Sequence, residues 1–198
     1  MRTALRATFA ALAIAALPPA AFAHTGVGVT GGFGHGVAHP VGGLDHILAM
    51  VAVGLFAAHL GGRALWLVPA AFVGMMAVGG GVGVSGMSLP FVETGIAASV
   101  VVFGLAIAFR WNLPLVAAMA LVGFFAVFHG HAHGSEMPVD ASGLRYGLGF
   151  MLATALLHAA GIAVGLGVGR IGERSRLAFQ AGGSAMALAG LGLLAGVI

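Results

Sequence analysis

Six apolar segments of about twenty residues each leave this chain few possible folds. About 20 residues of α-helix cross the hydrocarbon core of a bilayer. The chain is 60% hydrophobic, with a mean hydropathy of +1.10, which is too apolar for a soluble domain. Its 35 glycines are typical of transmembrane helices, where small residues let backbones approach closely. We therefore predict an all-α polytopic membrane protein with six helices at approximately residues 43–60, 64–84, 90–109, 113–129, 146–169 and 177–198.

The first 23 residues have the pattern of a secretory signal peptide. Arg2 and Arg6 make the start of the chain basic. A short apolar run then covers Phe9–Leu17, and two prolines follow it. Ala21–Ala23 then fits an A-x-A cleavage site. The alternative is an uncleaved first span, but the apolar run is short for one. We expect cleavage after residues 1–23, leaving residues 24–198 as a single transmembrane domain.

The arginines predict how this domain is oriented. A cleaved signal peptide places the mature N-terminus outside, and six crossings return the C-terminus to the same side. The three inner loops then hold five arginines, whereas the outer loops hold Arg145 alone. This asymmetry obeys the positive-inside rule. We expect a multi-pass protein of the bacterial inner membrane with both termini on the periplasmic side.

Composition also argues against several classes of function. The absence of cysteine excludes disulfides, thiolate metal sites and cysteine nucleophiles. The arginines are dispersed in short loops instead of gathering on one face, so no nucleic-acid partner is expected. No P-loop is present, so we do not expect ATP hydrolysis, and we interpret the chain as a non-enzyme.

Asp45 and His46, at the start of the first apolar segment, are unusual residues for a membrane-spanning helix. Only 7% of the chain is charged, and charged side chains in a bilayer are costly and often mark ion paths. Pro40 disfavours helix at the residue before it, so His39 is expected in a turn able to fold over the helix start. Asp45 would offset the repulsion of a cation by the helix N-terminus. Helix capping by Asp45 is the alternative, but we favour a cation site of His39, Asp45 and His46, with Met50 as a further candidate.

A second cluster follows the fourth segment, in the sequence Phe128-His-Gly-His-Ala-His-Gly-Ser-Glu136. Short His-rich tracts are typical of metal binding. His129 and His133 would share a face if helical, and alternate histidines would do so if extended. We expect Gly130–Arg145 to be the longest loop of the domain. The candidates for ion capture are His129, His133 and Glu136, with His131 as an additional one; a soluble loop with accidental histidines is the alternative.

The remaining polar candidates are isolated in the sequence. His158 lies near the middle of the fifth segment, where an ion ligand and an ordinary hydrogen bond to a neighbouring helix are equally open. Glu93, early in the third segment, is a candidate ligand, a proton acceptor or an interfacial residue. His24 and His35 precede the first segment and are candidates for ion entry. His59 closes the first segment and is interpreted as interfacial.

The donor types narrow the choice of metal. Without cysteine or a methionine array, a copper(I) path is disfavoured, and imidazole with carboxylate suits Ni²⁺, Co²⁺, Zn²⁺ or Cu²⁺. Affinity order does not select among these ions. We expect the metal to be a transported ion and no cofactor to be permanently bound.

Three stretches resemble the HupE/UreJ family of nickel or cobalt permeases and accessory proteins. They are HPVGGLDHILAMVAVGL from His39, FFAVFHGHAHGSEMP from Phe124 and GFMLATALLHAAGIAVG from Gly149. The first also resembles, with one extra spacer residue, the motif of the nickel/cobalt permease family. The resemblance implies uptake of Ni²⁺, or of Co²⁺, for enzymes such as hydrogenase or urease. It carries metal-binding roles to the following residues of this chain: His39, Asp45, His46, His129, His133, Glu136 and His158.

Other functions remain open at this point. One is an intramembrane zinc hydrolase, in which histidine ligands and an acid activate water. A second is a haem carrier with paired axial histidines, and a third is a metal sensor or store without flux. A cytoplasmic metal acceptor is a candidate partner besides the ion and the bilayer, and the oligomeric state is open.

Overall fold

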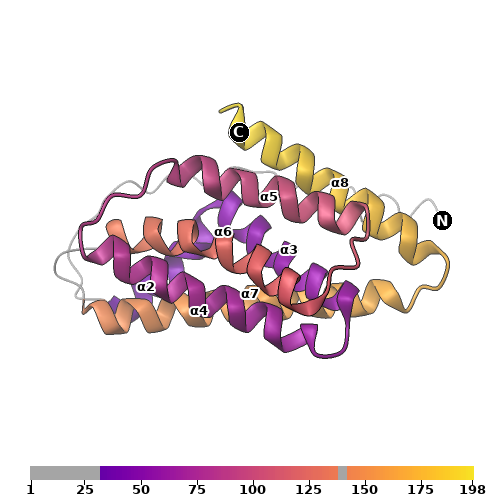
Figure 1. Cartoon of the computed structure of the whole chain (residues 1–198), viewed down its shortest axis with the longest axis horizontal. Coiled ribbons are helices and arrows are strands. Elements are labelled where there is room, and N and C mark those ends of the chain that lie inside the picture. The colour runs from indigo at the N-terminus through magenta and orange to yellow at the C-terminus, as the bar shows by residue number, and fades with distance from the viewer. Residues whose placement is uncertain (1–31, 138–141) are drawn as a thin grey trace, which may run out of the picture.

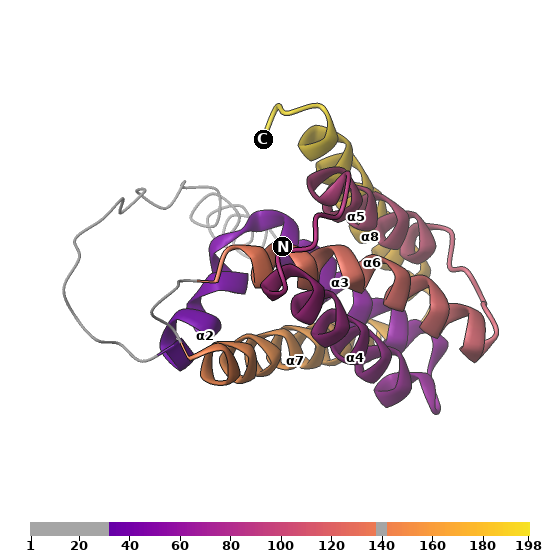
Figure 2. The same cartoon turned by 60° about the vertical axis from the view of Figure 1, so that its left-hand side comes forward.

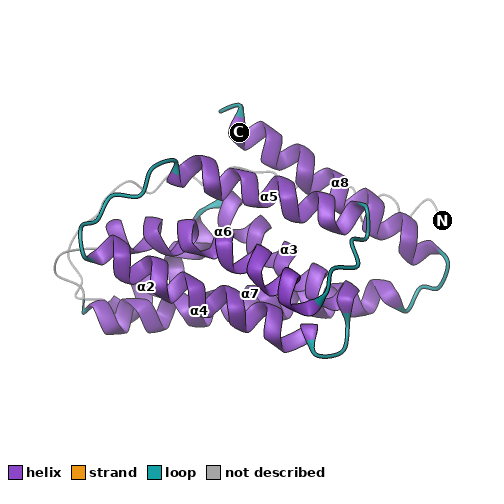
Figure 3. Ribbon diagram, in the orientation of Figure 1, coloured by secondary structure: helices purple, strands orange, loops and turns teal. Residues whose placement is uncertain are grey.

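The computed structural model describes residues 32–137 and 142–198, and all regular structure in them is helical (Figure 3). The signal-peptide prediction for residues 1–23 lies outside the described residues. The helices are α2 (Gly32–Gly42), α3 (Leu44–Leu60), α4 (Ala64–Val84), α5 (Val92–Ala108), α6 (Leu115–Ser135), α7 (Gly143–Gly169) and α8 (Arg174–Leu194). The all-α architecture is therefore confirmed, and one helix corresponds to each of the six predicted segments.

The lengths of these helices support a multi-pass membrane protein. Four of them, α4, α6, α7 and α8, are long and apolar enough to cross a bilayer. The pair α2 and α3 passes the same test together, as a broken span or re-entrant loop bent by 84°. Helix α5 is apolar but has only 17 residues. Four to five spans are thus supported, and the count of six stays a prediction.

Close backbone contacts at glycine hold the helices in pairs. Helix α4 packs on α6, α3 on α7 and α5 on α8, while α2 lies against the beginning of α7 (Figures 1 and 2). In the α4–α6 pair, a Cβ added to Gly79, Gly83, Gly130 or Gly134 would meet the backbone of the other helix. Each helix carries its two glycines four residues apart, the spacing that lets membrane helices approach closely. Gly54 and Gly161 do the same between α3 and α7.

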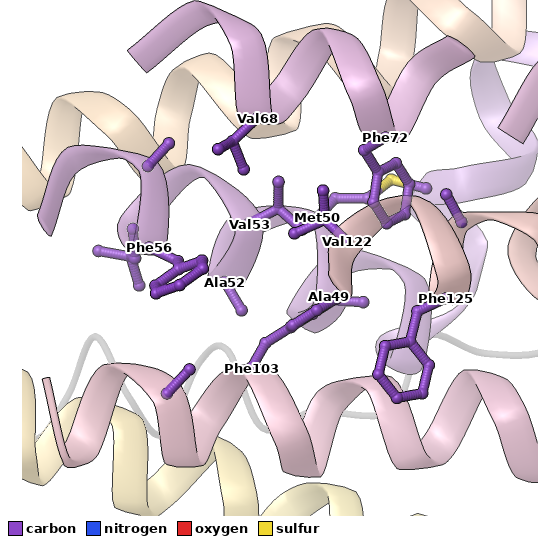
Figure 4. Close-up of a cluster of buried hydrophobic side chains, with 14 of the residues drawn as sticks. Ala49, Met50, Ala52, Val53, Phe56, Val68, Phe72, Phe103, Val122 and Phe125 are labelled. Carbon is purple, nitrogen blue, oxygen red and sulfur yellow. The ribbon is translucent and has the colours of Figure 1, made fainter. Parts of the chain in front are cut away.

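Helix α3 runs through the middle of the bundle. Its Met50, Val53 and Phe56 are fully buried against Phe72 of α4 and Phe103 of α5 (Figure 4). This packing fixes the direction of α3. It therefore also fixes where the polar residues of the first turn of α3 point.

The segment before α3 departs from the sequence prediction. His39 was expected in a turn because Pro40 follows it, but Gly32–Gly42 is a helix that contains both residues. Packing outweighs the local preference: Gly36 of α2 lies directly on the backbone of α7 at Tyr146. The chain breaks instead at Gly43, three residues after the proline.

The predicted loop Gly130–Arg145 is also largely wrong. Helix α6 continues to Ser135, and α7 already begins at Gly143. Gly130 and Gly134 stay helical because both lie against the backbone of α4. The whole His-rich tract is consequently helical.

Candidate metal site

The break between α2 and α3 brings three predicted site residues to one place. Gly43 is extended, with φ −106° and ψ 125°, while its carbonyl accepts a hydrogen bond from Ile47 N–H at 3.1 Å at the start of α3. The 84° bend at this point sets His39, near the end of α2, close to the first turn of α3. That turn carries Asp45 and His46.

A cavity of about 780 Å³ opens at this break. Seven predicted site residues line it: His35, His39, Asp45, His46, Glu93, His133 and Glu136. Asp45, Glu93 and Glu136 are three of the five acidic residues of the chain, and no arginine in the described part of the chain lines the cavity. A cleft lined by one sign of charge concentrates ions of the other sign, so this cavity attracts cations.

Helix α6 adds two histidines from the other side. His129 and His133 are four residues apart on one face of α6, and both are buried. The ring of His133 lies 4.7 Å from that of His39 and 4.4 Å from that of His46, between centroids. The ring of His129 lies 4.8 Å from that of His46. We call His39, His46, His129 and His133 the histidine cluster.

Asp45 orients His46. Its Oδ1 accepts the backbone N–H of His46 at 2.7 Å and lies 2.8 Å from His46 Nδ1. A carboxylate oxygen only accepts, so this contact assigns the proton to Nδ1 and leaves the lone pair on Nε2. His46 Nε2 is buried and has no partner among the described residues. A carboxylate on one ring nitrogen with the other nitrogen bare is the arrangement found around metal-ligating histidines.

Two further rings are held in a similar way. Glu136 Oε2 lies 3.0 Å from His39 Nε2. Ser99 donates its hydroxyl to the carbonyl of Ile96 at 2.6 Å, so its oxygen accepts from His129 Nε2 at 3.0 Å. His129 Nδ1 is thereby left bare and buried.

His133 completes the cluster without an orienting partner. It is 2% exposed, and neither of its ring nitrogens is paired among the described residues. An unpaired buried polar group costs about 1–3 kcal/mol, so native structures retain few of them. Three neighbouring histidines, His46, His129 and His133, therefore hold costly bare nitrogens beside a negatively charged cavity.

His158 lies deeper than the cluster. Its ring centroid is 5.1 Å from that of Phe72, which lies 5.5 Å from that of His129. Both ring nitrogens of His158 are buried, and neither has a partner in the described part of the chain. Thr154, one turn away, bonds Met76 Sδ at 3.7 Å instead. The sequence left open an ordinary hydrogen bond from His158 to a neighbouring helix, and the described residues contain none.

Other predicted residues lie apart from the cluster. His131 donates Nε2–H to the carbonyl of Met87 at 2.8 Å and does not line the cavity. Met50 lies in the hydrophobic core. His35 and Glu93 line the cavity but are exposed, and His24 lies outside the described residues.

Sequence reasoning missed three residues near this site. Ser99 orients His129, Phe72 contacts both His129 and His158, and Tyr146 lines the cavity with a buried hydroxyl that has no partner among the described residues. Ser99 carries a sequence signal, because it is a lone hydroxyl in the run from Ile96 to Ala108. Phe72 carries none, because its neighbours along α4 are equally apolar.

The cluster is not a closed metal centre. Among residues 32–137 and 142–198, no group of three or more His, Asp or Glu side chains is arranged to hold a metal ion as it stands. The rings meet edge to face, at 69° to 86°, so their nitrogens do not converge on one point.

Comparison with known proteins identifies the family of the chain. The sequence model of the HupE / UreJ protein family matches residues 12–193. The chain belongs to this family. Protein HupE of Rhizobium leguminosarum bv. viciae is 48% identical to it over 185 residues, which cover 93% of this chain and 95% of that protein. No solved structure matches the chain. The resemblance of the three stretches to the HupE / UreJ family is thus confirmed.

Proposed function

We propose that the chain carries a divalent transition-metal ion across the bacterial inner membrane. The ion we propose is Ni²⁺, with Co²⁺ as the alternative, supplied to metalloenzymes such as hydrogenase or urease. The observation that carries the proposal is the set of bare, buried imidazole nitrogens of His46, His129 and His133 beside a cavity lined by three carboxylates. Imidazole with carboxylate is a donor set that suits these ions.

In this proposal the histidines act in sequence. The cavity concentrates the hydrated ion, and His39 and Glu136 meet it at the outer edge. His46 and His133 replace part of its water, while Asp45 keeps the His46 ring oriented and contributes negative charge. Asp45 is thus assigned an orienting role instead of the direct ligation that its motif implied.

The route inward passes from His129 to His158. The ring of Phe72 contacts both, with centroids 5.5 Å from that of His129 and 5.1 Å from that of His158. His158, with both nitrogens unpaired, would receive the ion at mid-helix depth. Delivery to a cytoplasmic acceptor would complete the transfer.

The geometry favours transit over permanent binding. A zinc hydrolase needs three protein ligands held around one ion. Here the cluster and His158 offer donors in succession, and no trio in the described residues is already converged. Conduction requires binding strong enough to admit the ion and weak enough to release it. Donors arranged in series suit that requirement.

Nickel accumulation in cells tests the proposal. At matched protein level in the membrane, His46→Ala is expected to lower accumulation to that of cells without the protein. Asp45→Asn should weaken metal affinity about 10–100-fold, the usual effect of losing an orienting carboxylate. Glu173→Gln, which removes an acid outside the cavity, is the control and should accumulate nickel normally. Normal accumulation in the His46 variant would remove this cluster from the path.

A further inference from the structure

A second cavity lies at the end of the molecule opposite the histidine cluster. It has a volume of about 390 Å³ and lies where α3, α5 and α7 end and α8 begins. The polar side chains lining it are His59, Arg110, Arg170 and Ser175, and no acidic residue among those the structure describes lines it. Its charge is therefore opposite to that of the first cavity. It attracts anions and repels a divalent cation, so it does not continue the cation path.

Arg110 occupies a backbone position that normally belongs to glycine. Its φ is 52°, and helix α5 ends there with Arg110 N–H bonded to Ile107 O and Trp111 N–H bonded to Ala106 O. This is the Schellman pattern, in which the left-handed residue is usually glycine. Helix α8 ends with the same two bonds around Gly196, whose φ is 64°. An arginine in this conformation is strained where a glycine is not, which points to a use for its side chain.

His59 is a further polar group of the cavity. Its Nε2 is buried, and the ring lies on the cavity wall 5.9 Å from that of Phe179. Positive charge after a helix C-terminus is favourable in itself, and arginines on one side of a membrane set topology. Neither reason requires a left-handed arginine.

We propose that this cavity binds a phosphate group. Arg110 and Arg170 supply the charge-assisted hydrogen bonds, and His59 and Ser175 supply neutral donors beside them. The phosphate belongs either to the headgroup of an anionic phospholipid or to a soluble phosphate, since the two present the same oxygens. The proposal involves no metal and stands apart from the transport function.

Thermal unfolding of the full-length protein tests this site. The wild type is placed in nanodiscs of phosphatidylcholine alone, of phosphatidylcholine with phosphatidylglycerol, or of phosphatidylcholine with added inorganic phosphate at constant ionic strength. Binding to the folded state raises the Tm in proportion to the logarithm of ligand excess. We expect a rise in one or both of the last two samples. A rise with phosphatidylglycerol alone identifies the lipid headgroup, and a rise with inorganic phosphate identifies a soluble phosphate.

Arg110→Gly separates binding from folding. Glycine relieves the left-handed strain, so this variant should unfold at a higher temperature than wild type without ligand and lose the ligand-dependent rise. Arg170→Gln should lose the rise as well. Arg176→Gln removes the same charge from α8 outside the cavity and should keep it. The proposal is overturned if neither ligand raises the wild-type Tm, or if the cavity variants keep the same rise as Arg176→Gln.

Discussion

At the scale of single residues, the site depends on which nitrogen of each histidine is free. Asp45 occupies Nδ1 of His46 and Ser99 occupies Nε2 of His129, so each ring keeps one buried nitrogen for an ion. His131 has its Nε2 bonded to a backbone carbonyl and does not line the cavity. Three histidines in five residues of sequence therefore have different roles.

A matched pair of variants tests this difference. His133→Gln is expected to lower Ni²⁺ affinity at least tenfold, because it removes the ring between His39 and His46. His131→Gln keeps a donor for the Met87 carbonyl and should bind Ni²⁺ like wild type. Isothermal titration of both purified proteins measures the two affinities. Equal losses would mean that the composition of the tract matters and the orientation of its rings does not.

The residue types of the site could be predicted from the sequence, but their roles could not. A costly acid and several histidines in an apolar chain indicate a cation site, and seven of the predicted residues do line one cavity. Whether Asp45 ligates or orients depends on side-chain torsion within one helical turn, which no spacing encodes. Ser99 and Phe72 enter the site only through packing between helices distant in sequence.

At the scale of helices, glycine spacing sets the positions of the histidines. Gly79 and Gly83 of α4 lie against the α6 backbone, and Gly130 and Gly134 of α6 lie against the α4 backbone, so the two backbones touch along the His-rich tract. The sequence predicts a loop over most of this tract, and its glycines are unfavourable in isolated helices. Their spacing of four residues was the signal for helix packing, and both helices carry it. The bend at Gly43 falls in the Gly42-Gly43 pair, which can bend, whereas Pro40 suggested an earlier break.

Two glycines of α4 provide a direct test of this packing. Alanine at Gly83 would meet the backbone carbonyl of His131, whereas alanine at Gly81 meets nothing within 4 Å. Gly83→Ala is expected to destabilise the fold by about 1–3 kcal/mol, as overpacked core positions do. Gly81→Ala should be neutral or slightly stabilising. Thermal unfolding in detergent compares the two, and equal unfolding temperatures would contradict the close α4–α6 contact.

At the scale of the whole molecule, charge is divided between the two ends. Three carboxylates line the cavity at the histidine end, while two arginines line the cavity at the other end. The loops at that end and the first turn of α8 hold five of the eight arginines of the chain. This division follows the positive-inside rule if the histidine cluster faces outward. This division of charge could be predicted from the arginines of the loops alone, because the positive-inside rule depends on composition and not on helix packing.

The absence of cysteine makes this orientation simple to measure. Ser88→Cys lies in the loop between α4 and α5 at the histidine end, and Asn112→Cys lies in the loop between α5 and α6 at the other end. A membrane-impermeant maleimide should label Ser88→Cys in intact spheroplasts and Asn112→Cys only after permeabilisation. The reverse pattern would place the histidine cluster inside and contradict the proposed direction of uptake.

Flux across a reconstituted membrane tests the central claim most directly. Purified wild type, His46→Ala and Glu173→Gln are each inserted into liposomes containing a nickel-sensitive dye. The account predicts that added Ni²⁺ enters wild-type and Glu173→Gln vesicles faster than empty ones, and enters His46→Ala vesicles no faster than empty ones. Ni²⁺ entry at the empty-vesicle rate with wild type, or at the wild-type rate with His46→Ala, would contradict it.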